Sequence, residues 1–86
     1  RIPHIGWNTV SIAKSCRMYE GIGDADFYFV HSYVMETADE SVVSGRCDHG
    51  QNFIASVERG NVWGTQYHPE KSQKAGLKLI GNFLAC

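Results

Sequence analysis

The residues best suited to chemistry lie in the run Gln66 to Ser72, which reads Gln-Tyr-His-Pro-Glu-Lys-Ser. His68 and Glu70 are two residues apart, and in an extended segment residues i and i+2 point to the same side. A carboxylate beside an imidazole holds it in one tautomer and stabilises its charged form, as the third member of a nucleophile, base and acid triad does. Pro69 favours extended geometry at His68, so the pair should be rigid. This spacing suggests acyl-transfer chemistry, although a structural hydrogen bond or simple surface polarity would explain the same His-x-Glu pattern.

We expect a series of strands to place His68 and Glu70 at the end of a sheet. The separators Asp48-His49-Gly50 and Arg59-Gly60-Asn61 are short and rich in turn formers, so the runs that they divide should be antiparallel neighbours in a meander. The last run places His68 at its end, where active-site loops tend to lie. The three predicted strands are Ser41 to Arg46, Gln51 to Glu58 and Val62 to Tyr67.

The first half of the chain predicts two further strands joined by a polar connection. Arg1 to Ile12 alternates loosely in hydrophobicity and contains Trp7, a large side chain that could anchor a small core. The connection from Lys14 to Asp26 contains glycines and could form a short helical turn. The segment Asp26 to Met35 is largely apolar on both faces, so we predict a strand in the centre of the sheet.

The chain should close with an amphipathic helix. Ser72 suits the N-cap position, and an apolar stripe runs from Gln73 to Leu84. Gly76 and Gly81 each weaken a helix by roughly 1 kcal/mol relative to alanine, so we expect them to allow close approach to the sheet. Together the elements predict an α/β fold class, with a mostly antiparallel sheet of about four to six strands and one C-terminal amphipathic helix.

Composition argues against several classes of function. The formal net charge is −1 and no basic run occurs, which argues against nucleic acid or an anionic membrane as a partner. No apolar stretch approaches the roughly 18 residues of a spanning helix, and no signal-peptide pattern is present, so a cytoplasmic location is expected. Neither a metal ion nor a cofactor is expected.

The cysteines are odd in number, which favours reduced thiols; they are Cys16, Cys47 and Cys86.

Cys47 is the one cysteine whose surroundings suggest a nucleophile. The run Gly45-Arg46-Cys47-Asp48-His49-Gly50 superficially matches a nucleophile elbow, with a thiol that His49 would activate. Its spacing of Gly-x-Cys-x-x-Gly is one residue too long, and it lies between two predicted strands, whereas an elbow joins a strand to a helix. We therefore predict that Cys47 is not catalytic.

The run His68-Pro69-Glu70-Lys71-Ser72 resembles a signature of the class I (triad-type) glutamine amidotransferases, in particular of the glutaminase subunits of imidazole glycerol phosphate synthases. Other segments match in order and spacing, so the resemblance covers essentially the whole chain. It implies that His68 and Glu70 belong to a Cys-His-Glu triad that hydrolyses glutamine to glutamate and ammonia. The other matching segments are Pro3 to Asn8, Tyr28 to Tyr33, Gly76 to Ile80 and Asn82-Phe83.

The resemblance also implies binding roles. His31, Ser32 and Tyr33 would lie beside the glutamine pocket, whereas the residues alone favour a core or half-buried histidine at position 31 with a satisfied hydrogen bond. The partner of the complete enzyme would be a barrel-shaped cyclase subunit. Lys71 would pair there with an acidic group, and without a partner it is an ordinary exposed lysine. The residues implied at this subunit interface are Ile5, Trp7, Asn8, Tyr28 and Lys71.

One part of the family's machinery does not occur in these 86 residues. Family members carry the nucleophilic cysteine in a Gly-x-Cys-x-Gly elbow upstream of the Pro-His-x-Gly-Trp-Asn segment. We therefore expect residues 1–86 to form a single partial domain, the C-terminal half of an amidotransferase domain, which carries base and orienting acid and is inactive alone. The alternative is a non-catalytic module stabilised as a homo-oligomer, because such a half should expose an apolar face and an open sheet edge.

Overall fold

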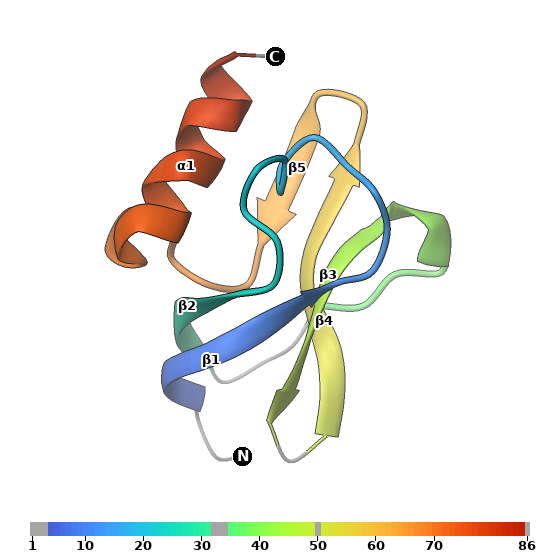
Figure 1. Cartoon of the computed structure of the whole chain (residues 1–86). Coiled ribbons are helices and arrows are strands. Elements are labelled where there is room, and N and C mark those ends of the chain that lie inside the picture. The colour runs from blue at the N-terminus through green and yellow to red at the C-terminus, as the bar shows by residue number, and fades with distance from the viewer. Residues whose placement is uncertain (1–3, 32–34, 50, 86) are drawn as a thin grey trace.

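The computed structural model describes residues 4–31, 35–49 and 51–85 of the chain (Figure 1). This part of the chain contains five antiparallel strands, one α-helix and two 3-10 turns. The strands lie in the order β2-β1-β3-β4-β5, so the last three form the predicted meander. The predicted α/β class, with an antiparallel sheet and a C-terminal helix, is confirmed. The elements are β1 (His4–Ile12), β2 (Ala25–His31), η1 (Glu40–Val42), β3 (Val43–His49), β4 (Gln51–Arg59), β5 (Val62–Thr65), η2 (Pro69–Lys71) and α1 (Gln73–Leu84).

The prediction that the strand over Asp26 to Met35 lies in the centre of the sheet is wrong. The described strand β2 lies at the edge of the sheet, where it pairs with β1, and residues 32–34 of the predicted strand lie outside the described residues. Its inner face is buried, but Val30 on its outer face is 43% exposed, so an apolar sequence on both faces did not require cover on both. The other side of β2 is approached by the segment after β5, because Phe29 and Tyr67 form an isolated antiparallel bridge.

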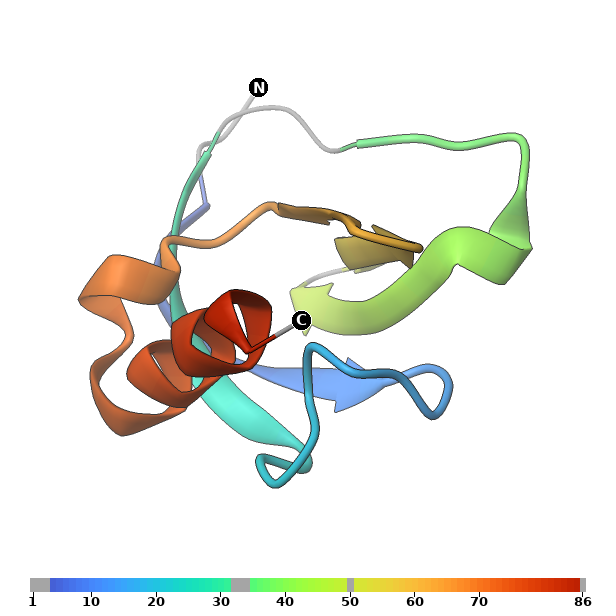
Figure 2. The same cartoon turned by 90° about the horizontal axis from the view of Figure 1, so that it is seen from above.

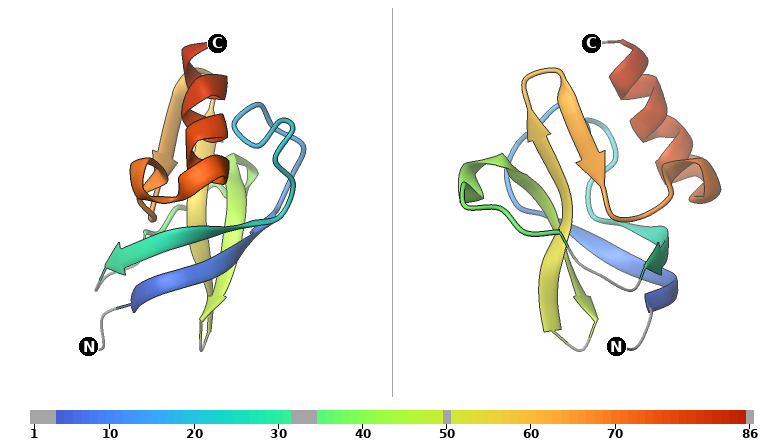
Figure 3. Two further views of the ribbon diagram at one scale, coloured as in Figure 1. Left: turned by 60° about the vertical axis from the view of Figure 1, so that its left-hand side comes forward. Right: turned by 180° about the vertical axis from the view of Figure 1, so that it is seen from behind.

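The core lies inside a strongly twisted sheet. In the two views of Figure 3, β1 and β2 cross β3 and β4 steeply, and α1 covers one end. Tyr19, from the connection before β2, enters the core with only 3% of its surface exposed. Its hydroxyl lies 2.5 Å from Ser56 Oγ and 2.7 Å from the Tyr67 hydroxyl, so these buried polar groups satisfy one another. The main cluster contains Val10, Met18, Tyr19, Phe27, Phe29, Cys47, Phe53, Ala55, Tyr67 and Leu79.

Helix α1 has the predicted bounds but buries only part of its apolar stripe. Leu79 is 4% exposed, whereas Leu77 and Leu84 are 65% and 78% exposed. The helix lies beside the connection that precedes β2 (Figure 2). Asn82 Nδ2 donates hydrogen bonds to two carbonyl oxygens of that connection, those of Met18 and Glu20, at 3.1 and 2.9 Å. Polar contacts therefore anchor α1 in addition to its apolar face.

Candidate active site

His68 and Glu70 lie together after β5, as their spacing predicts. His68 Nδ1 is 3.0 Å from Glu70 Oε2, and the two side chains are 40% and 59% exposed. His68 is extended, but Glu70 lies in the turn η2 that Pro69 begins, so a turn and not a straight strand brings the side chains together. Because Nδ1 faces the carboxylate, Nε2 is the nitrogen left for a reacting proton. The structure gives Nε2 no hydrogen-bond partner among the described residues.

Backbone and side-chain hydrogen bonds hold His68 against β2. The His68 N–H donates to the Tyr28 carbonyl oxygen at 2.9 Å. The hydroxyl of Ser72 donates to the His68 carbonyl oxygen at 2.6 Å and accepts the Tyr28 N–H at 2.9 Å. Ser72 is 1% exposed, so these bonds are shielded from water. Ser72 occupies the predicted N-cap position of α1, but its side chain makes no capping bond.

The turn η2 packs closely against helix α1 at Gly76. A methyl group on Gly76 would lie 1.8 Å from the carbonyl oxygen of Pro69, so only glycine allows this approach. Gln73, between the two elements, adopts a φ of 54°, which side-chain-bearing residues adopt uncommonly. Gly76 therefore allows a close approach, as predicted, but the element that approaches it is η2 and not the sheet. Gly81 has no atom within 4 Å of an added methyl group, so its predicted close approach is wrong.

Glu70 is held in its charged form. Its own backbone N–H and then the His68 ring keep the pKa of its carboxyl below the usual range. A carboxylate that is ionised at neutral pH attracts a proton to the bonded imidazole and stabilises the imidazolium once it forms. The electrostatics of the pair therefore match those of a base and its orienting acid.

Neither described cysteine is placed to act with His68. Cys47 is 1% exposed within the core, and burial, followed by the nearby Asp48 charge, raises the pKa of its thiol to about 11. Burial also raises the pKa of the half-buried Cys16 thiol. Neither sulfur makes a hydrogen bond with His68 in the described ranges. A protonated core thiol is a poor nucleophile, which agrees with the prediction that Cys47 is not catalytic.

The predicted substrate-side residues are described only in part. Ser32 and Tyr33 lie outside the described residues. His31 is half-buried at the end of β2, and its Nε2 lies 3.0 Å from Nδ1 of His4, directly opposite on β1. Asn8 Nδ2 in turn lies 2.8 Å from His4 Nε2. His4 was not among the predicted site residues, although it lies in the matching segment Pro3 to Asn8.

The predicted docking residues fall on different sides of the sheet. Ile5 and Trp7 point outward from β1 and are 62% and 45% exposed, so Trp7 does not anchor the core. Tyr28 packs beside Trp7, with ring centroids 5.6 Å apart. Asn8 alternates to the other face of β1, where it meets His4. Lys71 is exposed at the end of η2.

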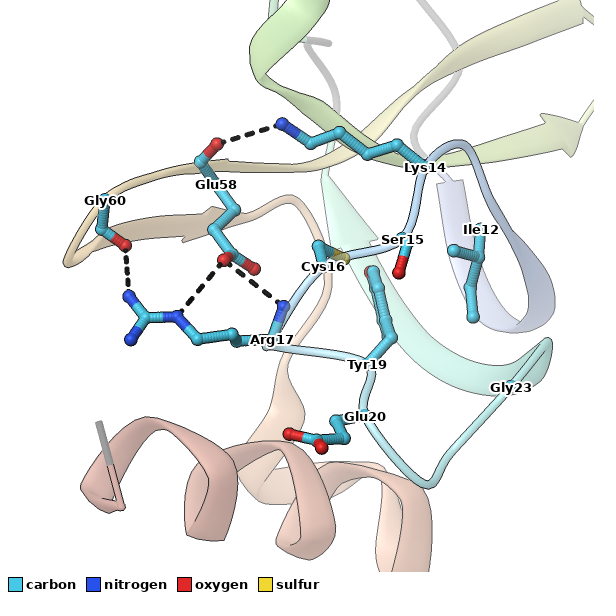
Figure 4. Close-up of a pocket in the computed structure, with 10 residues that line it drawn as sticks. All are labelled: Ile12, Lys14, Ser15, Cys16, Arg17, Tyr19, Glu20, Gly23, Glu58 and Gly60. Atoms are coloured by element: carbon cyan, nitrogen blue, oxygen red, sulfur yellow. Dashed lines mark hydrogen bonds and ion pairs between the residues drawn. The ribbon is translucent and has the colours of Figure 1, made fainter.

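A cavity of about 660 Å³ lies elsewhere, between the connection before β2 and the β4–β5 turn (Figure 4). Glu58 accepts hydrogen bonds there from the backbone N–H groups of Met18, at 2.9 Å, and Arg17, at 3.3 Å. Arg17 also donates to the Gly60 carbonyl oxygen at 3.0 Å. These bonds join the connection to the hairpin, and no predicted site residue lines the cavity. Its lining residues are Ile12, Lys14, Ser15, Cys16, Arg17, Tyr19, Glu20, Gly23, Glu58 and Gly60.

The described residues contain neither a metal-binding cluster nor a membrane-spanning helix. No group of three or more His, Cys, Asp or Glu side chains is arranged to hold a metal ion within residues 4–31, 35–49 and 51–85. In the same ranges, no helix has the length and apolar character needed to cross a membrane.

The sequence of the chain is similar to those of known proteins along almost its whole length. The chain is 51% identical over 85 residues to the imidazole glycerol phosphate synthase subunit HisH of Pelagibacter ubique, a match that covers 98% of this chain and 41% of that protein. It is 52% identical over 84 residues to the subunit HisH of Aquifex aeolicus, covering 96% and 41%, respectively. The corresponding subunit of Methanocaldococcus jannaschii is 47% identical over 85 residues, covering 98% and 43%.

The chain spans about two fifths of the length of these curated relatives. The family model described as glutamine amidotransferase class-I matches residues 1–85, nearly the whole chain. The chain therefore belongs to the class-I glutamine amidotransferase family.

Proposed function

We propose that this chain supplies the general base and the orienting acid of a glutaminase, which hydrolyses glutamine to glutamate and ammonia. The single observation that carries the proposal is the 3.0 Å contact between His68 Nδ1 and Glu70 Oε2 in a chain of this family. His68 would take the thiol proton of a cysteine nucleophile through Nε2 and deliver it to the departing ammonia. Glu70 would stabilise the imidazolium between these steps.

The nucleophile must come from outside these residues. The sequence contains no Gly-x-Cys-x-Gly elbow, and the buried Cys47 thiol is protonated at neutral pH. Removing one oxyanion-hole donor typically costs about 10² to 10³ in rate, and removing the nucleophile eliminates the covalent route. We therefore expect these 86 residues alone to show no glutaminase activity.

The names of the relatives suggest the larger assembly. They are subunits of imidazole glycerol phosphate synthase, so we propose that a complete enzyme containing this chain works with a second, cyclase subunit of that synthase. Exposed Ile5 and Trp7, with Tyr28 beside them, form an apolar surface suited to such a contact. Exposed Lys71 could add an ion pair, and Asn8, on the inner face of β1, would act behind this surface rather than in it.

Reconstitution tests the catalytic proposal. The chain would be mixed with a separately expressed N-terminal segment of a related subunit that carries the elbow, and glutamate release from glutamine would be measured. We expect activity only in the mixture, and a loss of at least about 10² with His68→Ala, because general-base catalysis typically contributes about 10² to 10⁴. A Glu70→Gln variant would be measured in the same mixture. Glu36→Gln, which removes an exposed carboxylate in a loop, is its matched control. Activity of the chain alone, removed by Cys47→Ser, would overturn the assignment.

A second role, as a self-associating folded module, is favoured by the apolar side chains around β5 and α1. Val62 is 72% exposed and Phe83 is 47% exposed, and the indole N–H of Trp63 is buried without a hydrogen-bond partner in the described part of the chain. A second copy that covers these exposed side chains could remove apolar area from water. Light scattering after size-exclusion chromatography tests this, and a monomer at all micromolar concentrations would contradict it.

A further inference from the structure

Three side chains on the inner face of the β1–β2 pair form a continuous hydrogen-bonded row. Asn8 Nδ2 lies 2.8 Å from His4 Nε2, and His4 Nδ1 lies 3.0 Å from His31 Nε2. His4 is 4% exposed, and its ring stacks on Phe29 at a centroid distance of 4.6 Å and an interplanar angle of 14°. The ring plane of His4 is therefore set by packing, and both of its nitrogens are engaged.

The backbone of β1 makes this row possible. His4 and His31 are direct partners in the antiparallel register, which brings their side chains together. His4 and Asn8 are four residues apart, a separation of about 13 Å in a straight strand. Gly6 lies between them with a φ of 131°, a conformation that other residues rarely adopt. We attribute the contact between Asn8 and His4 to this backbone conformation.

The direction of the hydrogen bonds follows from the chemistry of the groups. An amide nitrogen has only donors, so His4 Nε2 must accept the bond from Asn8 and carry no proton. The single proton of this neutral ring is then on Nδ1, which donates to His31 Nε2. Nε2 of His31 is thereby an acceptor, and the proton of its neutral ring is on Nδ1. The orientation of one amide thus determines the tautomers of two histidines.

We propose that Asn8 and His4 are positioning residues that fix the ring orientation of His31 and keep its N–H on Nδ1. The role of this row rests on the proposed function: beside a glutamine pocket, it would keep the His31 ring in one orientation and one tautomer. Asn8 and His4 act only through His31. The row itself stands on geometry that does not depend on glutaminase activity.

Nitrogen NMR of the 86-residue chain, labelled with ¹⁵N-histidine, tests the row directly. Near pH 8, well above the usual histidine pKa of about 6.5, long-range proton–nitrogen correlations distinguish protonated from bare ring nitrogens. We expect bare Nε2 and protonated Nδ1 on both His4 and His31. An Nε2-protonated His4 in the unaltered chain would overturn the proposal without any variant.

Two variants then test causation. Asn8→Asp replaces a donor with a carboxylate that only accepts, so His4 Nε2 should change from bare to protonated. His4→Phe keeps a stacking ring but removes the bond to His31, whose Nε2 should become largely protonated. Asn61→Asp, the same substitution at an exposed position, is the control and should change neither histidine. If the His31 nitrogens were unchanged in a folded His4→Phe chain, His4 would not set its tautomer. These spectra can fail while the reconstituted glutaminase succeeds, and the reverse, so the two proposals are tested separately.

Discussion

The backbone N–H of His68 donates a hydrogen bond to the carbonyl oxygen of Tyr28 at 2.9 Å, which joins the end of the β5 segment to the edge strand β2. This bond places the candidate base beside the strand that ends in His31. It also explains why the edge of β2 is covered although no further strand pairs with it in the described sheet. The base is therefore positioned by the fold of the first half of the chain as well as by its own local sequence.

Ser72→Ala should loosen this attachment. The substitution removes two shielded hydrogen bonds and leaves the Tyr28 N–H without its acceptor, so we expect a loss of about 1–3 kcal/mol in the free energy of unfolding. Urea denaturation measures this loss, and amide exchange at His68 should also become faster. Ser11→Ala, at an exposed position of β1, is the control. Equal stability of the two variants would show that the Ser72 hydroxyl does not clamp the site.

The pH dependence of the His68–Glu70 pair follows from the lowered pKa of Glu70. Because its pKa is lower in the folded chain, the associated stabilisation is complete above the usual glutamic acid pKa of about 4.3 and is lost as the pH falls through the folded value. A ¹³C-carboxyl NMR titration should give a midpoint below that usual value. In His68→Ala the midpoint should rise only in part, since the backbone N–H of Glu70 is the larger cause and remains.

Asp39 provides an internal control for that titration. The hydroxyl and backbone N–H of Ser41 lower the pKa of Asp39, and neither group involves the site. Its midpoint should be the same with and without His68. A complete return of Glu70 to the usual range in His68→Ala would show that the imidazole alone lowers its pKa.

Cys47 should be nearly inert towards thiol reagents in the folded chain. With a pKa raised to about 11, its thiolate fraction at pH 8 is about one in a thousand, and burial blocks access as well. In a chain carrying Cys16→Ser and Cys86→Ser, reaction with a disulfide reagent should be at least about 100-fold slower than for an exposed thiol. Unfolding in denaturant should restore the ordinary rate, and fast reaction of the folded chain would contradict the assigned burial.

The two glycines of α1 should respond oppositely to alanine. Gly76→Ala places a methyl group 1.8 Å from the Pro69 carbonyl oxygen, so the helix or η2 must move, and we expect a loss of about 3 kcal/mol or more in the free energy of unfolding. Gly81→Ala meets no atom within 4 Å and should stabilise the helix by about 0.5–1 kcal/mol. Urea denaturation of the two variants checks both signs. A stable Gly76→Ala chain would show that η2 does not pack tightly against α1.

Local signals predicted much of this molecule. Turn-forming residues at Asp48-His49-Gly50 and Arg59-Gly60-Asn61 predicted two hairpins from local preferences alone, and β3 pairs with β4, and β4 with β5, as predicted. The apolar period from Gln73 to Leu84 likewise gave helix bounds that the structure confirms. The errors concern relations between elements. The apolar faces of Asp26 to Met35 could not show whether another strand or open surface would lie outside them, and the edge position of β2 depended on its partners.

Local spacing is enough to identify the candidate base and orienting acid, because His68 and Glu70 are too close along the chain to separate far. What holds them depends on the folded chain, since the hydroxyl of Ser72 and the backbone of Tyr28 are 44 positions apart in the sequence and meet in the fold. The row of Asn8, His4 and His31 likewise exists only in the folded chain, through the pairing of β1 with β2 and the positive φ of Gly6. Such contacts depend on how all the elements pack together, so no short run of residues predicts them.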